Sequence, residues 1–227
     1  KACALKSCFV PPLVYRGYGQ MGVDPTGAPV DVIIACWPWG AYLGADALEK
    51  GIKVGVSSWR QRSNNAIPPQ MKSSASYMNS ILAKLEAKAH GYSEAVMLNE
   101  DGYVCEGTGE NLFLVRDGVL STPPVSEGLL EGITRDTILN LAMDLDIPVV
   151  EERLVRADLY GADEVFFTGS AAFLRNDGGQ ASRIQRLAVR SQIKLRRCAI
   201  AARQCLAACS CHFLLRVACP SSYCCYA

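Results

Sequence analysis

The sequence lacks an uninterrupted apolar run long enough to cross a membrane. Its most apolar stretch near the C-terminus, residues 199–219, is interrupted by Arg203 and Arg216 and falls short of the ~20 residues that a spanning helix needs. No secretory segment opens the chain, and the cysteines of the first 172 residues are scattered, as is typical of proteins in a reducing cytosol. We therefore expect a soluble, cytoplasmic protein with no membrane partner.

The chain also lacks a large net charge, because 23 Lys and Arg residues face 22 Asp and Glu residues. This balance hides an asymmetry. Residues 173–227 hold nine Lys or Arg residues and one acid, Asp177, so this tail carries +8, and the first 172 residues carry −7 of the total of +1. A basic tail can bind nucleic acid, but no aromatic residues are interleaved with its charges. A non-catalytic nucleic-acid-binding protein is therefore the weaker alternative, which a salt-dependent shift of duplex DNA would support.

Paired Cys-x-x-Cys spacing, a common signature of zinc sites, is missing as well. Seven of the eleven cysteines lie in the last thirty residues, where Cys209, Cys211 and His212 stand close together. Without a second ligand pair this cluster is weak support for zinc, so we predict no metal site. The tail also shows no capped helix and no sustained periodicity, and we expect it to be disordered.

The first 172 residues, in contrast, alternate between strand and helix patterns over enough chain to bury a core. Strands are predicted at residues 13–15, 31–37, 52–59, 95–98, 103–105, 111–115, 119–120, 149–150 and 164–168. The run 31–37 is continuously apolar, so we expect burial on both of its faces. Asp117-Gly118 between two apolar strands predicts a tight hairpin. We find no internal repeat.

Two helices are predicted. The first follows a loop that contains Pro68 and Pro69, and Gly91 ends it. Its apolar residues share one face: Met78, Ile81, Leu82, Leu85 and Ala89. The second runs from Thr134, its natural N-cap, to about Leu145.

Lys72 lies in the loop before the first helix, among small Ser and Ala residues and on a backbone that two prolines hold. A lysine in such a place can lose its proton when it is desolvated, and the free amine then forms a Schiff base with an aldehyde. A solvated loop lysine is the commoner case, because lysine is rarely buried without a partner.

Two acids, Glu106 and Glu110, lie in a glycine-rich bend beside strands that look buried. Turn acids that face water are the commoner case, whereas a buried carboxylate would need a cationic partner. Gly132-Ile133-Thr134 opens the second helix, and a helix N-terminus offers N–H groups to a phosphate. An amine, a carboxylate and such a helix start are the parts that a pyridoxal phosphate site requires.

Five motifs stand in the chain in one order: Pro38-Trp39-Gly40-Ala41-Tyr42-Leu43-Gly44, Lys72 with Tyr77-x-Asn79-Ser80, Glu106-Gly107-Thr108-Gly109-Glu110-Asn111-Leu112-Phe113, Gly132-Ile133-Thr134-Arg135 and Gly169-Ser170-Ala171-Ala172. With these motifs, residues 12–172 resemble a branched-chain amino-acid aminotransferase, one of the fold-type IV pyridoxal phosphate enzymes. The resemblance implies a mixed α/β large domain, a curved sheet or pseudo-barrel with outer helices, over residues 45–172. Residues 1–44 would be a remnant of a small N-terminal domain with the interdomain loop, and 173–227 would be the tail.

The resemblance also implies roles for single residues. Lys72 would be the Schiff-base lysine and proton carrier, Tyr77 would hydrogen-bond the phenolic oxygen of the cofactor, and Glu106 would pair with its pyridine nitrogen. Leu130 would lie against the ring. The phosphate would be held by Ile133, Thr134 and Ser170.

The substrate contacts follow from the same resemblance. The backbone of Ser170 and Ala171 would meet the α-carboxylate, and Trp39 and Tyr42 would line the pocket for an apolar side chain. The implied reaction is transamination of leucine, isoleucine and valine with 2-oxoglutarate, as in branched-chain amino acid biosynthesis. Intact members of this family usually form homo-oligomers.

A D-amino-acid aminotransferase or an aminodeoxychorismate lyase of the same fold would share Lys72, Glu106 and Thr134. The stretch from Pro38 to Gly44 favours the branched-chain enzyme, and a substrate panel would separate the three. Parts of the family pattern are missing, including an N-terminal arginine for the phosphate and the usual sequence after Ala172. We therefore expect this chain by itself to be a weak or inactive enzyme.

Overall fold

The computed structural model describes residues 8–38, 51–169 and 173–176. The described residues 8–38 belong to one compact unit, and the remainder belong to a second. Trp39, Tyr42, Ser170 and Ala171 lie outside the described residues, as does the tail beyond Asn176. The division into domains that the sequence suggests stays a prediction.

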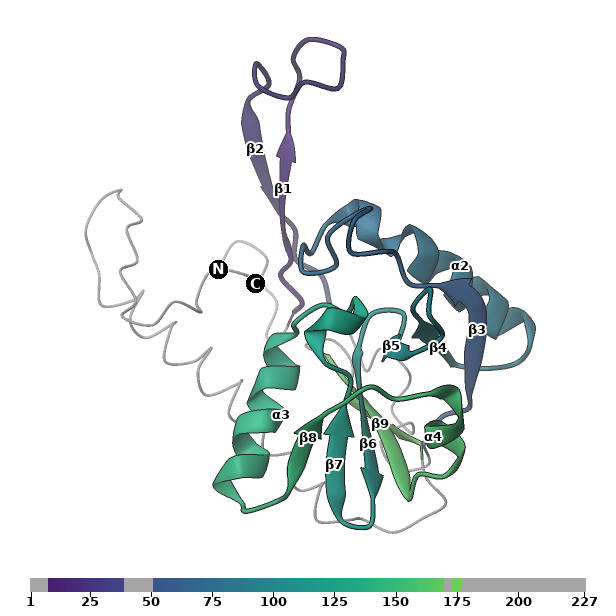
Figure 1. Cartoon of the computed structure of the whole chain (residues 1–227). Coiled ribbons are helices and arrows are strands. Elements are labelled where there is room, and N and C mark those ends of the chain that lie inside the picture. The colour runs from purple at the N-terminus through teal and green to yellow at the C-terminus, as the bar shows by residue number, and fades with distance from the viewer. Residues whose placement is uncertain (1–7, 39–50, 170–172, 177–227) are drawn as a thin grey trace. The chain divides into compact units, whose positions relative to one another are not determined.

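The first unit contains an antiparallel hairpin of β1 (Pro12–Arg16) and β2 (Val30–Ile34), seen in Figure 1. Both strands are exposed along their whole length. The prediction that residues 31–37 are buried on both faces is therefore wrong for β2. A two-stranded ribbon supplies no second layer, so its side chains stay exposed whatever their hydrophobicity.

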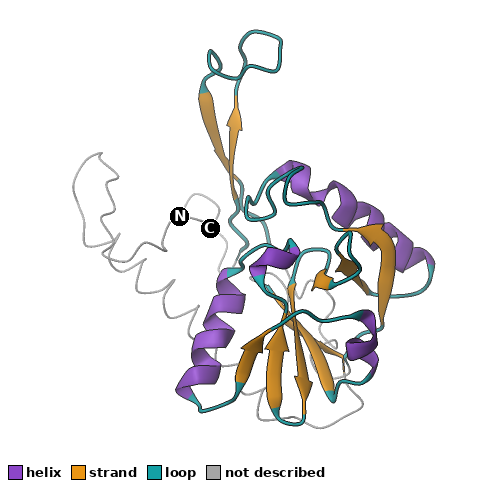
Figure 2. Ribbon diagram, viewed as in Figure 1, coloured by secondary structure: helices purple, strands orange, loops and turns teal. Residues whose placement is uncertain are grey.

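The second unit is built on two sheets (Figures 1 and 2), one with five strands in the order β10-β9-β6-β7-β8 and one with three in the order β3-β4-β5. The strands are β3 (Val54–Arg60), β4 (Glu94–Leu98), β5 (Val104–Glu106), β6 (Asn111–Arg116), β7 (Val119–Thr122), β8 (Val149–Glu151), β9 (Glu164–Thr168) and β10 (Phe173–Asn176). β10 falls within the residues that the sequence pattern assigns to the tail.

Helices cover both sheets from outside. α2 (Tyr77–Ala89) packs on the three-stranded sheet, and α3 (Ile133–Asp144) packs on the five-stranded sheet. The connections contain the short helices η1 (Ser74–Ser76), η2 (Val125–Glu127) and α4 (Arg156–Tyr160). Among the described residues, no helix combines the length and the apolar character needed to cross a membrane.

The core is layered because β6 is buried on both faces. Phe113 belongs to the cluster beneath α3, whereas its neighbours Leu112 and Leu114 belong to the cluster between the sheets, since successive side chains of a strand point to opposite faces. Phe166 and Phe167 of β9 divide in the same way. The predicted mixed α/β fold with outer helices is confirmed.

The hairpin predicted at Asp117-Gly118 is also confirmed. Arg116 pairs with Val119, and the two residues between them have φ angles of 51° and 77°. Both values lie in the left-handed region that a two-residue turn of this type requires. This turn fixes the register of β6 against β7.

The apolar face predicted for the first helix exists but is exposed. Met78, Ile81 and Leu85 are 62%, 53% and 59% exposed. The helix instead packs through small residues, since Ala83 and Ala87 form a buried cluster with residues of β4. Small side chains allow the helix axis to lie close to the sheet, and this close packing selects the buried face.

Candidate functional site

Lys72 lies on a loop whose backbone is held on both sides. Before it, the Met71 N–H donates to the Pro68 carbonyl at 3.0 Å. After it, the Asn79 amide of α2 donates to the Arg60 carbonyl at 2.8 Å, which ties the helix start to the end of β3. The Lys72 side chain is exposed and thus accessible to a small molecule.

Tyr77, the first residue of α2, is the neighbour of this lysine. The Lys72 ammonium nitrogen lies 6.0 Å from the centroid of the Tyr77 ring, within the range of a cation–π contact. Tyr77 is 37% exposed. The structure therefore brings these two predicted residues together at an accessible position.

Glu106, the last residue of β5, is held by three hydrogen-bond donors. The Gln61 amide donates to Oε1 at 2.6 Å, while the Leu130 backbone N–H and the Asn111 amide donate to Oε2 at 3.1 Å and 3.4 Å. Glu106 is half-buried, and Glu110 is only 4% exposed. The alternative that these two acids face water is therefore wrong.

The surroundings of Glu106 favour its protonated form. Burial raises the pKa of Glu106 to about 7, because the carboxylate loses hydration. The hydrogen bonds from Leu130 and Gln61 lower this pKa, as do the charges of Arg62 and Lys72. Lys72 is thus close enough to Glu106 for their charges to interact.

α3 starts beside the same cluster. Its N-cap is Gly132, so the prediction that Thr134 is the cap is wrong. No side chain caps this helix start, so the first N–H groups have no partner within the helix. A Cβ at Gly132 would lie 2.2 Å from Asn111 Oδ1. The absence of a side chain therefore allows the helix start to approach Asn111 of β6.

Two buried hydroxyl groups near this point have no hydrogen-bond partner among the described residues. Thr134 and Thr168 are 2% and 1% exposed, and neither Oγ1 is paired. Thr168 lies opposite Asn111 in the β6–β9 pair, so the two side chains share one face of the sheet. Buried hydroxyls are normally satisfied, and a bound polar group would satisfy them here.

Six of the predicted site residues lie in the described part of the second unit: Lys72, Tyr77, Glu106, Leu130, Ile133 and Thr134. The sequence assigns no role to Gln61 or Asn111, although both contact Glu106. The sequence gives only weak indications that these two residues belong to the site. Gln61 is a polar residue directly after a strand, and Asn111 is a polar residue at the start of a buried strand.

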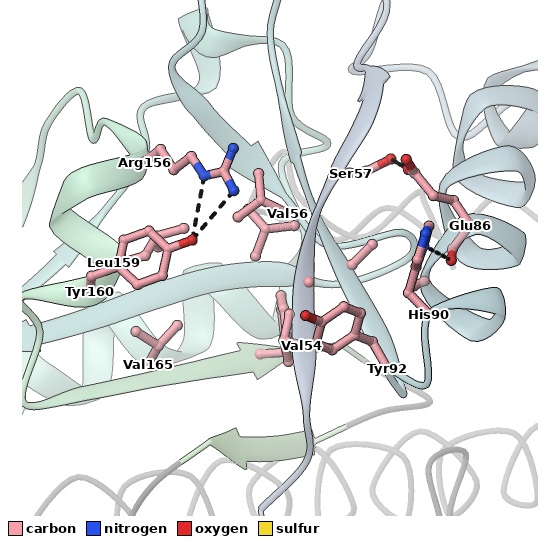
Figure 3. A pocket seen from close by; sticks show the side chains of 15 residues that line it. Val54, Val56, Ser57, Glu86, His90, Tyr92, Arg156, Leu159, Tyr160 and Val165 are labelled. Atoms are coloured by element: carbon pink, nitrogen blue, oxygen red, sulfur yellow. Dashed lines mark hydrogen bonds between the residues drawn. The ribbon is translucent and has the colours of Figure 1, made fainter.

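A cavity of about 360 Å³ lies elsewhere in the second unit, between β3, the end of α2, α4 and β9 (Figure 3). Val54, Val56 and Val165 contribute apolar walls, and the Arg156 guanidinium donates to the Tyr160 hydroxyl at 3.4 Å. None of the predicted site residues lines this cavity. The candidate site is therefore the cluster around Glu106.

The described residues contain no group of three or more His, Cys, Asp or Glu side chains that could hold a metal ion. Cys209, Cys211 and His212, the residues of the zinc alternative, lie outside the described part of the chain.

Comparison with known proteins decides the family, since the model of the class IV amino-transferases matches residues 1–176. The chain belongs to this family. This class IV aminotransferase chain is 52% identical, over 169 residues, to the branched-chain-amino-acid aminotransferase of Escherichia coli strain K12, covering 74% of the chain and 55% of that protein. It thus spans about half the length of the curated relatives it matches.

Solved structures agree with this assignment. The crystal structure of the Escherichia coli branched-chain amino acid aminotransferase matches with a TM-score of 0.79 at 45% identity, covering 84% of this chain and 66% of that one. The branched-chain amino acid aminotransferase from Thermobaculum terrenum in its PLP form matches with a TM-score of 0.77 at 30% identity, covering 86% of this chain and 66% of that one. The predicted family and fold are confirmed.

Proposed function

We propose that the protein containing this chain transfers the amino group of leucine, isoleucine or valine to 2-oxoglutarate, with pyridoxal 5'-phosphate bound at Lys72. One observation carries the proposal: the anchored carboxylate of Glu106 lies near the accessible amine of Lys72 and beside the uncapped start of α3. The Escherichia coli relative, named a branched-chain-amino-acid aminotransferase, supports the substrate class.

The residues present fit pyridoxal phosphate. The unpaired Thr134 hydroxyl and the uncapped N–H groups of Ile133 and Thr134 are donors that a phosphate would satisfy. Hydrogen bonds from Gln61, Leu130 and Asn111 fix the Glu106 carboxylate, and its negative charge would stabilise a protonated pyridine nitrogen. The Thermobaculum terrenum relative was solved in its PLP form, which supports the same cofactor.

Four residues of the site would then contact the cofactor. Lys72 would hold the cofactor through its amine, and once the substrate amine has displaced it, the freed Lys72 amine would move the proton at the substrate Cα. Glu106 would keep the pyridine nitrogen protonated, the Tyr77 hydroxyl would hydrogen-bond the phenolic oxygen, and Leu130 would pack against the ring. When bound, the cofactor supplies an electron sink for the charge that develops at Cα.

The remaining assignments stay predictions, because their residues lie outside the described part of the chain. These are Ser170 at the phosphate, the backbone of Ser170 and Ala171 at the substrate carboxylate, and Trp39 and Tyr42 as walls of the substrate pocket. A homo-oligomeric assembly and a cytoplasmic location also stay predictions.

Borohydride reduction tests the role of Lys72. The purified 227-residue chain is incubated with pyridoxal phosphate, reduced, digested and mapped by mass spectrometry. We expect a pyridoxyl adduct on the peptide that contains Lys72. The Lys72→Ala variant should lose this adduct, and Lys88→Ala, which removes an exposed lysine of α2, should keep it. Adducts found only on other lysines would refute the assignment.

A substrate panel tests the reaction. With pyridoxal phosphate present, glutamate formation from 2-oxoglutarate is measured with leucine, isoleucine or valine, and pyruvate formation from D-alanine is measured beside it. Turnover of the branched-chain substrates that exceeds turnover of D-alanine supports the proposal. The reverse order would favour a D-amino-acid aminotransferase.

A further inference from the structure

Gln61 is a buried amide that the fold holds in one orientation. It follows β3 directly, is 3% exposed, and its backbone N–H donates to the Leu98 carbonyl at 2.8 Å. Its side-chain Oε1 accepts from the Arg62 backbone N–H at 3.2 Å, and its Nε2 donates to Glu106 Oε1 at 2.6 Å. Because the amide oxygen has a donor and the amide nitrogen has an acceptor, the two ends are distinguished.

The two oxygens of Glu106 are thus fixed from different elements. Gln61, after β3, holds Oε1, while Leu130 and Asn111 hold Oε2. All three donors are neutral amides. Among the described residues, no Lys or Arg nitrogen lies within ion-pair distance of Glu106.

The charged and titratable groups that face Glu106 act through space. Arg62 and Lys72 stabilise its carboxylate, while Glu110 and the Cys105 thiol are the other titratable neighbours that feel its charge. A direct cation at the position of the Gln61 amide would stabilise the carboxylate more strongly, because charge-assisted hydrogen bonds are roughly twice as strong as neutral ones. The neutral amide therefore immobilises the acid, and it favours the carboxylate form less strongly than a cation in the same place would.

We propose that Gln61 is a positioning residue, whose hydrogen bond holds the Glu106 carboxylate in the orientation in which it can pair with a protonated pyridine nitrogen. This inference rests on the proposed function, because the pyridine nitrogen is that of the proposed cofactor. Gln61 itself acts only through Glu106.

The first experiment uses the cofactor-free chain. The Glu106 carboxyl is titrated by isotope-edited infrared spectroscopy, and Glu106→Gln identifies its signal. We expect Gln61→Met, which keeps the length and removes the donor, to raise the pKa of Glu106 by about 0.5 to 1 unit. Gln61→Arg should lower it. Asn65→Ala, an exposed amide in the same loop, should leave it unchanged, and Gln61→Asn serves if the Met variant does not fold.

The second experiment adds the cofactor. Gln61→Met should weaken pyridoxal phosphate binding by about 3- to 10-fold, which titration of the chain with the cofactor measures. If wild-type chain binds no pyridoxal phosphate, the proposed function fails and this inference fails with it. If the cofactor binds but the Glu106 titration does not respond to Met or Arg at position 61, the inference about Gln61 alone is overturned.

Discussion

At the residue scale, the neighbouring buried acids Glu94 and Glu110 differ in their hydrogen-bond partners. Glu94 is fully buried, and it accepts from the Lys84 ammonium at 2.5 Å and from the Thr108 hydroxyl at 2.6 Å. The Glu110 carboxylate, in contrast, accepts only from the Gly109 backbone N–H, at 3.1 Å, among the bonds of the described residues. Burial, followed by the nearby Glu94 charge, raises the pKa of Glu110 to about 7. Glu110 is therefore largely protonated in mildly acidic solution.

We predict that the free energy of unfolding falls as the pH rises from about 4.5 to about 7. In this window the folded chain keeps protons on Glu106 and Glu110 that the unfolded chain has released, so raising the pH favours unfolding. Glu110→Gln should flatten the slope and stabilise the chain by on the order of 1–3 kcal/mol above pH 7. Urea unfolding across this pH range measures the effect.

The control for this prediction is Glu100→Gln, which alters an exposed turn acid and should leave the slope unchanged. A Glu110→Gln variant with the wild-type slope would show that Glu110 is ionised in the folded chain well below pH 7.

At the scale of elements, sequence patterns predicted what depends on neighbours along the chain. Asp117-Gly118 fixed a turn by its own backbone preference, and the second helix lies within a residue of its predicted bounds. The Glu106 side chain is fixed in part by a hydrogen bond from Gln61, which is far away in the sequence. No local pattern contains such a contact, which is why Gln61 was missed.

The predicted N-cap of α3 was wrong, and the burial of α2 does not follow its apolar face, for a related reason. Thr134 has the residue type of an N-cap, but Gly132 takes that place because the helix must approach Asn111. Likewise the largest side chains of α2 are exposed while Ala83 and Ala87 are buried. The N-cap of α3 and the buried residues of α2 both depend on how closely each helix approaches its sheet. The hydrophobicity of the side chains does not predict this distance.

We predict that Gly132→Ala destabilises the chain by about 1–3 kcal/mol and weakens pyridoxal phosphate binding. The new Cβ would meet Asn111 Oδ1 at 2.2 Å, so either the helix start or the Asn111 side chain must move. Thermal unfolding and cofactor titration measure the two effects. Gly109→Ala, at a glycine whose added Cβ meets nothing within 4 Å, is the control.

The same clash gives a double-variant test. In an Asn111→Gly background the Cβ at position 132 loses its nearest neighbour, so Gly132→Ala should then destabilise the chain less. Equal losses in both backgrounds would place the strain somewhere other than Asn111.

We also predict that the small residues of α2 matter more for stability than its large ones. Ala83→Leu should cost about 1–3 kcal/mol because the buried contact with β4 has no space for the larger side chain. Ile81→Ala should cost less than about 0.5 kcal/mol, since Ile81 is 53% exposed. Chemical denaturation of both variants gives the comparison, and a larger loss for Ile81→Ala would mean that its face is covered in solution.

At the scale of the whole second unit, the candidate site joins the two sheets. Gln61 follows β3 and Glu106 ends β5 in the three-stranded sheet, while Asn111 begins β6 of the five-stranded sheet. Lys72 lies in the loop between β3 and η1. The connection that carries Leu130 completes the junction. The geometry of the site therefore depends on both sheets being formed and packed.

The strand order β10-β9-β6-β7-β8 also has a consequence for the order of events in folding. β6 reaches β7 through a two-residue turn but meets β9 only after most of the intervening chain has been placed. Hairpins close within microseconds, whereas distant pairings wait for loop closure. In pulse-labelled hydrogen exchange, amides of the β6–β7 hairpin should become protected before those of β9. Pyridoxal phosphate added at the start of refolding should then leave the hairpin step unchanged, because the surface that would receive it is assembled last.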